Sequence, residues 1–143
     1  MVTPGLRFRI DFGNRCSVGS GKIELLEGIA RAGSLSQAAR AMRMSYRRAW
    51  LLLEDLNISF DQPVATASVG GRGGGGVVLT AFGTELVCGY RELEGRINTL
   101  AAGYVDRFSG HLKTAQSKRI VKRASLKRKA SARAKRRDSP KAT

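Results

Sequence analysis

The uneven distribution of charge divides this chain of 143 residues into a part that can fold and a part that cannot. Residues 1–110 carry 13 basic and 10 acidic side chains, whereas residues 111–143 carry 13 basic and 1 acidic side chain. The last stretch also has few large apolar residues, too few to offset the entropy of ordering a chain. We therefore expect one small folded domain over residues 1–107 and a basic, disordered tail over residues 108–143.

The composition excludes several classes of protein. The net charge of +15 indicates a polyanion-binding protein. No apolar run approaches the roughly 18 residues that span a bilayer, and the N-terminus lacks the apolar block of a signal peptide. Cys16 and Cys88 are isolated thiols, and His111, the single histidine, begins the tail, so no His-based catalytic or metal cluster fits inside the fold. We expect a cytoplasmic protein, not an enzyme, with no cofactor, metal, membrane or small-molecule site.

The first hundred residues carry the signals of short alternating elements. Apolar and charged residues alternate over residues 6–12, which predicts a strand with Leu6, Phe8, Ile10 and Phe12 facing the core. A Gly/Ser-rich loop follows. Residues 22–32 then have helical spacing, with Ser20 as the expected cap and a stop at Gly33.

Two capping signals follow within twelve residues. Ser34 and Gln37 form a capping-box pattern that opens a helix to about residue 42, and Ser45 caps a second helix to about residue 60. Tyr46, Arg47 and Arg48 fall in the first turn of the second helix, where a groove-reading helix makes its contacts. We expect Trp50 to lie on its apolar, core-facing side. The pattern favours a helix-turn-helix, although an ordinary helical bundle has the same periodicity.

The spacing of small residues supports the motif at two positions and conflicts with it at one. Ala39 and Ala49 occupy the positions where the two helices must approach closely. Arg43 occupies the turn position, which favours glycine because the backbone there has positive φ. An arginine in that conformation costs about 1 kcal/mol unless the turn is built differently.

A glycine run interrupts the next pair of strand-like segments. Val64–Ser68 and Val77–Thr80 flank Gly70–Gly76, which predicts a hairpin, or wing, with Arg72 near its tip. The run contains G-x-G-x-x-G, but strand residues follow it where a dinucleotide-binding motif requires a helix. We therefore expect Arg72 to approach a phosphate backbone or a minor groove; a merely flexible loop is the alternative.

The last part of the folded domain, about residues 81–105, has the spacing of a helix that pairs with another helix. Apolar residues recur at alternating intervals of four and three, which predicts a dimer interface. This seam consists of Leu86, Tyr90, Leu93, Ile97, Leu100 and Tyr104.

These motifs together resemble a known family. The stretch Gly33–Leu56, including SYRRAW at residues 45–50, the run Gly70–Gly76 and the stretch Leu79–Gly83 closely resemble the N-terminal domain of the ModE family of molybdate-responsive bacterial transcription regulators. The resemblance covers residues 6 to about 105. It implies a LysR-like winged helix-turn-helix, recognition by the helix that starts at Ser45, wing contacts near Arg72 and dimerisation through the last long helix. Arg43 stands where the family usually has glycine, and the family's oxyanion-binding domains are replaced by the basic tail, so we do not expect this chain by itself to bind molybdate.

The expected fold is therefore mainly α with a small β wing, followed by a long dimerisation helix and a disordered tail. We expect contacts to double-stranded DNA from one group of residues: Ser34, Ser36, Gln37, Ser45, Tyr46, Arg47, Arg48 and Arg72. We expect Arg47 and Arg48 to point outward without intramolecular salt links, and either of them to contact guanine or phosphate. The serines could equally act as helix caps alone. Nonspecific contacts are expected from the tail clusters Lys127, Arg128, Lys129 and Lys135, Arg136, Arg137.

These expectations point to a dimeric transcriptional regulator that binds two half-sites. Two alternatives remain at this level. The first is a nucleoid-associated, architectural protein whose binding is dominated by the tail. The second is a helical module whose ligand is another protein.

Overall fold

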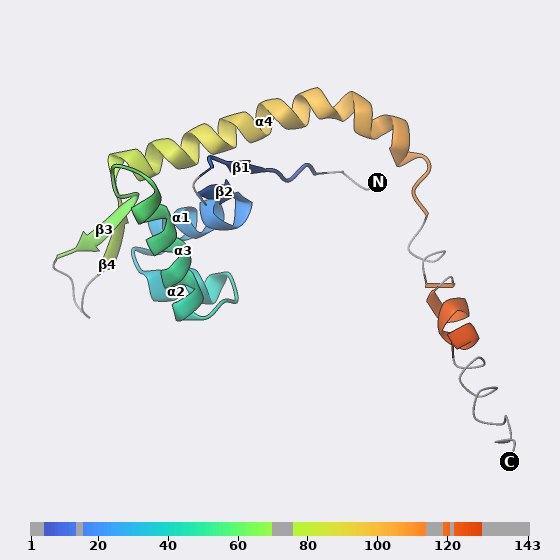
Figure 1. The fold of residues 1–143 in the computed structure, drawn as a ribbon, viewed down its shortest axis with the longest axis horizontal. Coiled ribbons are helices and arrows are strands. Elements are labelled where there is room, and N and C mark those ends of the chain that lie inside the picture. Colours follow the sequence, from blue (N-terminus) through green and yellow to red (C-terminus); the bar gives the residue numbers. More distant parts are fainter. Residues whose placement is uncertain (1–4, 14–15, 70–75, 114–118, 121, 130–143) are drawn as a thin grey trace, which may run out of the picture. The chain divides into compact units, whose positions relative to one another are not determined.

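The computed structural model describes residues 5–13, 16–69, 76–113, 119–120 and 122–129. It is mainly α-helical with two small antiparallel hairpins (Figure 1). The elements in chain order are β1 (Arg9–Asp11), β2 (Ser17–Gly19), α1 (Ser20–Ala32), α2 (Leu35–Ala41), α3 (Tyr46–Ser59), β3 (Ala65–Ser68), β4 (Gly76–Leu79) and α4 (Ala81–Ser109). This order and arrangement confirm the prediction of a winged helix-turn-helix.

The core lies where α1, α2 and α3 meet. Ile23, Leu26 and Ile29 of α1 are fully buried, as is Leu56 of α3. The small residues expected at the helix crossing, Ala39 and Ala49, are also buried. Because small side chains let helix backbones approach closely, α2 and α3 can pack tightly at their turn.

The caps that begin the two helices of the motif were predicted correctly. The Ser34 hydroxyl accepts a hydrogen bond from the Gln37 amide at 3.4 Å, and the Ser45 hydroxyl accepts one from the Arg48 amide at 3.2 Å. Each bond satisfies an amide that the first turn of a helix leaves unpaired. Ser20 does not cap α1; Gly19 holds that position and makes no side-chain cap.

The turn between α2 and α3 has the backbone conformation that the motif requires. Arg43 has φ of 54°, the only positive φ at a non-glycine position among the described residues. The Met44 amide donates to the Ala39 carbonyl at 3.0 Å, which closes the turn. Arg43 therefore adopts the left-handed backbone conformation in which an arginine is strained.

A hairpin near the N-terminus replaces the single long strand expected there. β1 covers only Arg9–Asp11 and pairs with β2, where the sequence predicts a Gly/Ser-rich loop. Val18 of β2 is fully buried, whereas Phe12, expected to face the core, is about half exposed. Phe12 still makes an edge contact with the Phe60 ring, 5.8 Å between centroids, at the rim of the core.

The wing is an antiparallel pair of strands in the predicted place. Ala65 pairs with Leu79 and Ser68 with Gly76. The Thr80 hydroxyl donates to the Pro63 carbonyl at 2.7 Å and accepts from the Gly83 amide at 3.0 Å, so it ties the wing to the start of α4. Gly83 is required at this contact, because a Cβ there would lie 1.9 Å from the Val64 carbonyl oxygen. The wing tip, including Arg72, lies outside the described residues.

The first half of α4 packs on the domain. Tyr90 is 3% exposed, its ring stacks on Phe8 at 4.7 Å, and its hydroxyl donates to the Phe8 carbonyl at 2.7 Å. Burial raises the pKa of the Tyr90 hydroxyl. Arg91 donates to Glu27 of α1 and to Glu94, which lowers the pKa of the Glu27 carboxyl and raises that of the guanidinium.

These contacts correct part of the expected dimer seam. Tyr90 belongs to the core of its own chain, because the N-terminal strand brings Phe8 onto it. Leu86 is half-buried against the same core. Leu93, Leu100 and Tyr104, by contrast, are exposed.

Residues 104–143 form a separate unit in which part of the described chain is helical. Residues 119–120 and 122–129 have helical backbone and exposed side chains, which corrects the expectation of a tail without regular structure. Ala, Leu, Lys and Arg favour helix intrinsically, which accounts for this segment. No helix in the described part of the chain is both long and apolar enough to cross a membrane.

Candidate nucleic-acid interface

The corner formed by α2, the turn and the first turns of α3 is strongly basic. Between Glu27 and Glu54 the sequence has five arginines and no acidic residue. Four of these arginines belong to the corner and are exposed, namely Arg40, Arg43, Arg47 and Arg48, and we call these four the basic corner. The fifth, Arg31, is exposed at the end of α1, where its charge adds to the hydrogen bonds of Arg91 in lowering the pKa of Glu27. A surface of one charge sign, without local neutralisation, attracts a polyanion.

The arginines of this basic corner have no acidic partner within the described chain. The ion pairs found there lie elsewhere: Arg9 with Asp11, Lys22 with Asp55, Arg91 with Glu27 and Glu94, and Arg96 with Glu92. A guanidinium in an ion pair must give up that pair to bind phosphate or guanine. The arginines of the basic corner have no such bond to break.

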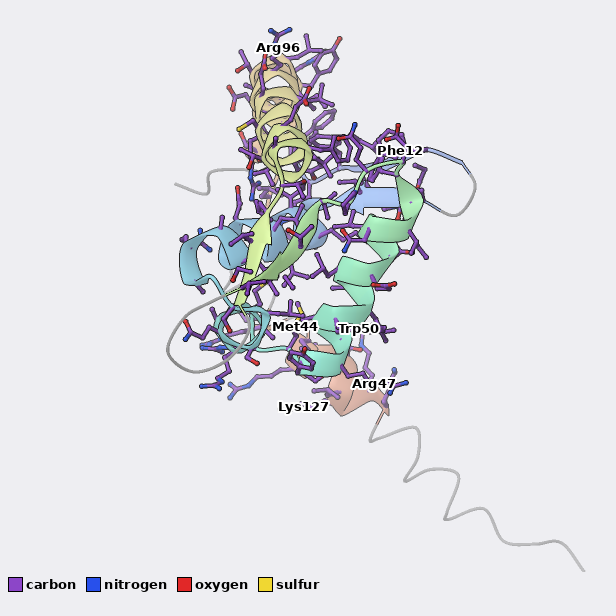
Figure 2. The ribbon with its side chains drawn as sticks, turned by 90° about the vertical axis from the view of Figure 1, so that its left-hand side faces the viewer. Phe12, Met44, Arg47, Trp50, Arg96 and Lys127 are labelled. Atoms are coloured by element: carbon purple, nitrogen blue, oxygen red, sulfur yellow. The ribbon has the colours of Figure 1, made fainter. Side chains whose placement is uncertain are left out.

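The N-terminus of α3 presents its side chains to solvent. Tyr46 is 56% exposed, and Arg47 and Arg48 beside it are exposed, as expected from the sequence. Figure 2 shows Arg47 at the end of α3 that lies next to the turn with Met44. The partial positive charge of a helix N-terminus adds to that of the arginines. This end of α3 therefore has the charge and the access that contact with nucleic acid requires.

Trp50 is a functional candidate that the sequence pattern does not indicate. It was expected in the core, but it is 46% exposed, while its neighbour Ala49 is fully buried. Figure 2 shows Trp50 near Arg47, on the same end of α3. Trp50 is therefore available to a ligand of this helix.

One ion pair holds α3 against the hairpin and α1. The Lys22 ammonium group, mostly buried, bonds to the Asp55 carboxylate of α3 and donates to the Ser17 carbonyl of β2 at 2.6 Å. A partly buried pair with such additional bonds restricts the helix more than an exposed pair does. It fixes the orientation of α3 relative to α1 and β2.

Asn57 fixes the wing relative to α3. Its side-chain oxygen accepts from the Val64 amide at 2.9 Å and from the Ala65 amide at 3.3 Å, and its side-chain nitrogen donates to the Ala65 carbonyl at 3.3 Å. These bonds join the last turns of α3 to the first residue of β3. Asn57 carried no sequence signal, because its bonding partners are set by the chain turning back after Pro63.

The other expected contact residues lie at different places. Ser34 is half-buried and caps α2, while Ser36 and Gln37 are exposed in the first turn of that helix. Lys127, Arg128 and Lys129 are exposed on the helical segment of the tail. Lys135, Arg136 and Arg137 lie outside the described residues. Within the described chain, no group of three or more His, Cys, Asp or Glu side chains is placed to hold a metal ion.

Comparison with known proteins finds relatives whose names refer to molybdenum or to transcription regulation. It is 43% identical over 89 residues to the molybdenum-pterin-binding protein MopA of Rhodobacter capsulatus, which is 62% of this chain and 33% of MopA. It is 39% identical over 66 residues to the DNA-binding transcriptional dual regulator ModE of Escherichia coli K12, 46% of this chain and 25% of that protein. No family model matches the sequence.

The chain spans about a quarter to a third of the length of these curated relatives. Their similarity confirms the resemblance to the ModE N-terminal region. A solved structure described as a CbnR DNA-binding domain in complex with DNA aligns with 65% of this chain and 97% of its own, at 22% identity and a TM-score of 0.45.

Proposed function

Because this chain carries a ModE-like helix-turn-helix region, we propose that it is a transcriptional regulator that binds double-stranded DNA by placing α3 in the major groove. The observation that carries the proposal is the basic corner, whose exposed arginines have no acidic partner in the described chain. A helix of this kind enters the groove with its N-terminal residues against the base edges. Tyr46, Arg47 and Arg48 occupy those positions.

Arg47 and Arg48 can each contact DNA in two ways, through a base or through a phosphate. A guanidinium can donate two hydrogen bonds to guanine O6 and N7, which discriminates against other bases by about 1–3 kcal/mol. It can also bind phosphate, which strengthens binding to every sequence equally. Ser34, Ser36 and Gln37 at the start of α2, and Ser45, are further proposed contacts to the phosphate backbone.

The test is selection of bound sequences from random DNA, followed by affinity measurements on the selected site. Arg47→Ala and Arg48→Ala are compared with Arg96→Ala, an exposed arginine of α4. The variant that loses a base contact should relax the preference at one base pair, and a variant that loses a phosphate contact should weaken all sequences and lower the salt slope by about one. If neither variant differs from Arg96→Ala, α3 does not read DNA, and a protein ligand becomes the better assignment.

We further propose that the regulator is a dimer formed through α4. The alternating intervals of four and three residues between the seam positions are symmetric about the midpoint between Leu93 and Ile97. Two antiparallel copies would bring Leu93 of one against Ile97 of the other across a twofold axis. Leu86 and Tyr90 pack on the core of their own chain, so we propose the exposed Leu93, Leu100 and Tyr104 for the interface. Such a dimer would bind two half-sites in successive major grooves, about 34–36 Å apart.

The wing and the tail would add contacts outside the major groove. Arg72 is proposed to contact phosphate or the minor groove from the wing, whose position relative to α3 is set by Asn57. The tail, with Lys127, Arg128 and Lys129 exposed, would add affinity independent of sequence. We take residues 1–107 as the DNA-binding and dimerisation domain and residues 108–143 as the basic tail.

A second function, architectural binding along the nucleoid, is favoured by the charge of that tail alone. Deleting residues 111–143 separates the two functions. A sequence-selective regulator keeps its site preference with a smaller salt slope, whereas an architectural protein loses nearly all its binding.

A further inference from the structure

The outward face of α3 carries apolar side chains that the core of this protein leaves uncovered. Trp50 is 46% exposed and Leu51 is 49% exposed. On a helix, residues three and four positions apart are neighbours on the surface. Trp50 and Leu51 therefore both lie about one helical turn after Arg47, one on each side of a line drawn through Arg47 parallel to the helix axis. An exposed arginine is thus followed directly by two exposed apolar groups.

The charge around these groups selects their ligand. An apolar helix face could bind another protein, but this one lies on the helix that begins with the exposed Arg47 and Arg48, and no acidic residue occurs between Glu27 and Glu54. That surface complements the phosphates on both sides of a DNA groove. The ligand must therefore present an apolar group at the bottom of an anionic groove.

The thymine C5-methyl group fits this description. In the major groove it is the apolar feature of the base edges, and it distinguishes thymine from the other bases. The indole ring offers a large apolar surface, and its Nε1–H can only donate. An arginine and an apolar side chain one turn apart would read different, neighbouring base pairs.

We propose that Trp50 is a specificity-determining residue that contacts a thymine methyl group in the major groove, next to the base pair or phosphate bound by Arg47. Leu51 covers the opposite side of the same contact. This inference rests on the proposed function, because it requires α3 to lie in the groove. It goes further by assigning an apolar base contact to a residue that sequence periodicity places in the core.

The test removes the methyl group from the DNA and leaves the rest of the base unchanged. Each thymine of the selected site is replaced singly by deoxyuridine, and the affinity of the full-length protein is measured. Loss of one buried methyl group should weaken binding about fourfold at one thymine of each half-site. At the remaining thymines the affinity should be unchanged.

Variants then assign the effect to Trp50. Trp50→Ala should bind the thymine and deoxyuridine sites equally, because the group that senses the methyl is gone. Ile58→Ala, an exposed apolar residue two turns further along α3, is the matched control and should keep the fourfold difference. If Trp50→Ala does not fold, as judged by circular dichroism, Trp50→Leu replaces it and should retain a reduced difference.

The possible results separate this inference from the proposed function. If the protein selects a site but every deoxyuridine substitution is neutral, or if Trp50→Ala keeps the methyl dependence, the inference is wrong and the regulator remains. If no site can be selected and Arg47→Ala has no effect, the proposed function itself fails. A methyl effect that disappears in Trp50→Ala but persists in Ile58→Ala supports both.

Discussion

The two halves of α4 share one heptad pattern and differ in what surrounds them. In the first half, Tyr90 is buried against Phe8, and Arg91 joins α1 through Glu27. In the second half, Leu100 is 76% exposed and Tyr104 is 65% exposed, although both continue the same spacing. A heptad pattern therefore identifies an apolar face, but contacts with neighbouring elements determine which part of that face stabilises the monomer.

The largest difference is expected between the two tyrosines of the seam. Tyr90→Ala should lower the free energy of unfolding by about 3 kcal/mol or more, because it removes a buried ring from the core. Tyr104→Ala should change it by less than about 0.5 kcal/mol in the monomer. Urea unfolding of both variants at low protein concentration measures this. Similar losses of unfolding free energy for the two variants would show that the halves of α4 are equally buried and would contradict the difference described above.

The second prediction concerns the exposed half as a dimer surface. Leu100→Asp should leave the fold intact, because the side chain has no core contact, but it should prevent self-association by placing a charge in an apolar interface. Loss of the second half-site would weaken DNA binding about a hundredfold. Analytical ultracentrifugation and titration with a two-half-site DNA provide the readout. A sedimentation profile identical to that of the parent protein would remove the dimer proposal.

The smallest effect is expected between two arginines of α4, Arg91 and Arg96. Arg91→Met should destabilise the fold by about 1 kcal/mol, because Arg91 bonds to Glu27 and Glu94 in a partly buried site. Arg96→Met, which removes an exposed pair with Glu92, should cost less than about 0.5 kcal/mol. Thermal or urea unfolding at neutral pH provides the comparison.

The contribution of Arg91 should also depend on pH. The pKa of Glu27 lies below its ordinary value of 4.5 because Arg91 donates hydrogen bonds to it. Its stabilising effect is therefore fully present above pH 4.5 and is lost as the pH falls through the lowered value. The stability difference between the parent protein and Arg91→Met should shrink in that range. A difference that stays constant down to pH 2 would contradict the assignment.

The helix-turn-helix was predictable because its signals are local. Ser34 and Ser45 cap helices through amides three positions away, and Arg43 adopts positive φ within a turn closed by nearby residues. Exposure of Arg47 and Arg48 also followed from the sequence, since both fall in the first turn of α3, next to its capping residue Ser45. Such features need only a few consecutive residues to form.

The site was predicted less completely because some of its residues depend on distant partners. Trp50 lies next to the apolar residues of α3, and only the position of α1 and α2 decides that the core stops at Ala49 and Leu53. Asn57 holds the wing through bonds to Val64 and Ala65, which no pattern in α3 announces. The strand β2 escaped detection because three residues carry no measurable periodicity.

The order of the helices and the wing, the arginines of the basic corner and the apolar face of α4 follow from local sequence signals, because periodicity, capping and charge act between residues close along the chain. The burial of Tyr90 and the exposure of Tyr104 and Trp50 depend on long-range packing that no local signal indicates. The physical reason is that burial depends on contacts between segments far apart in sequence, as when Phe8 packs on Tyr90. The heptad spacing of α4 locates its apolar side chains, and the tertiary contacts determine which of them are packed against other residues of the chain.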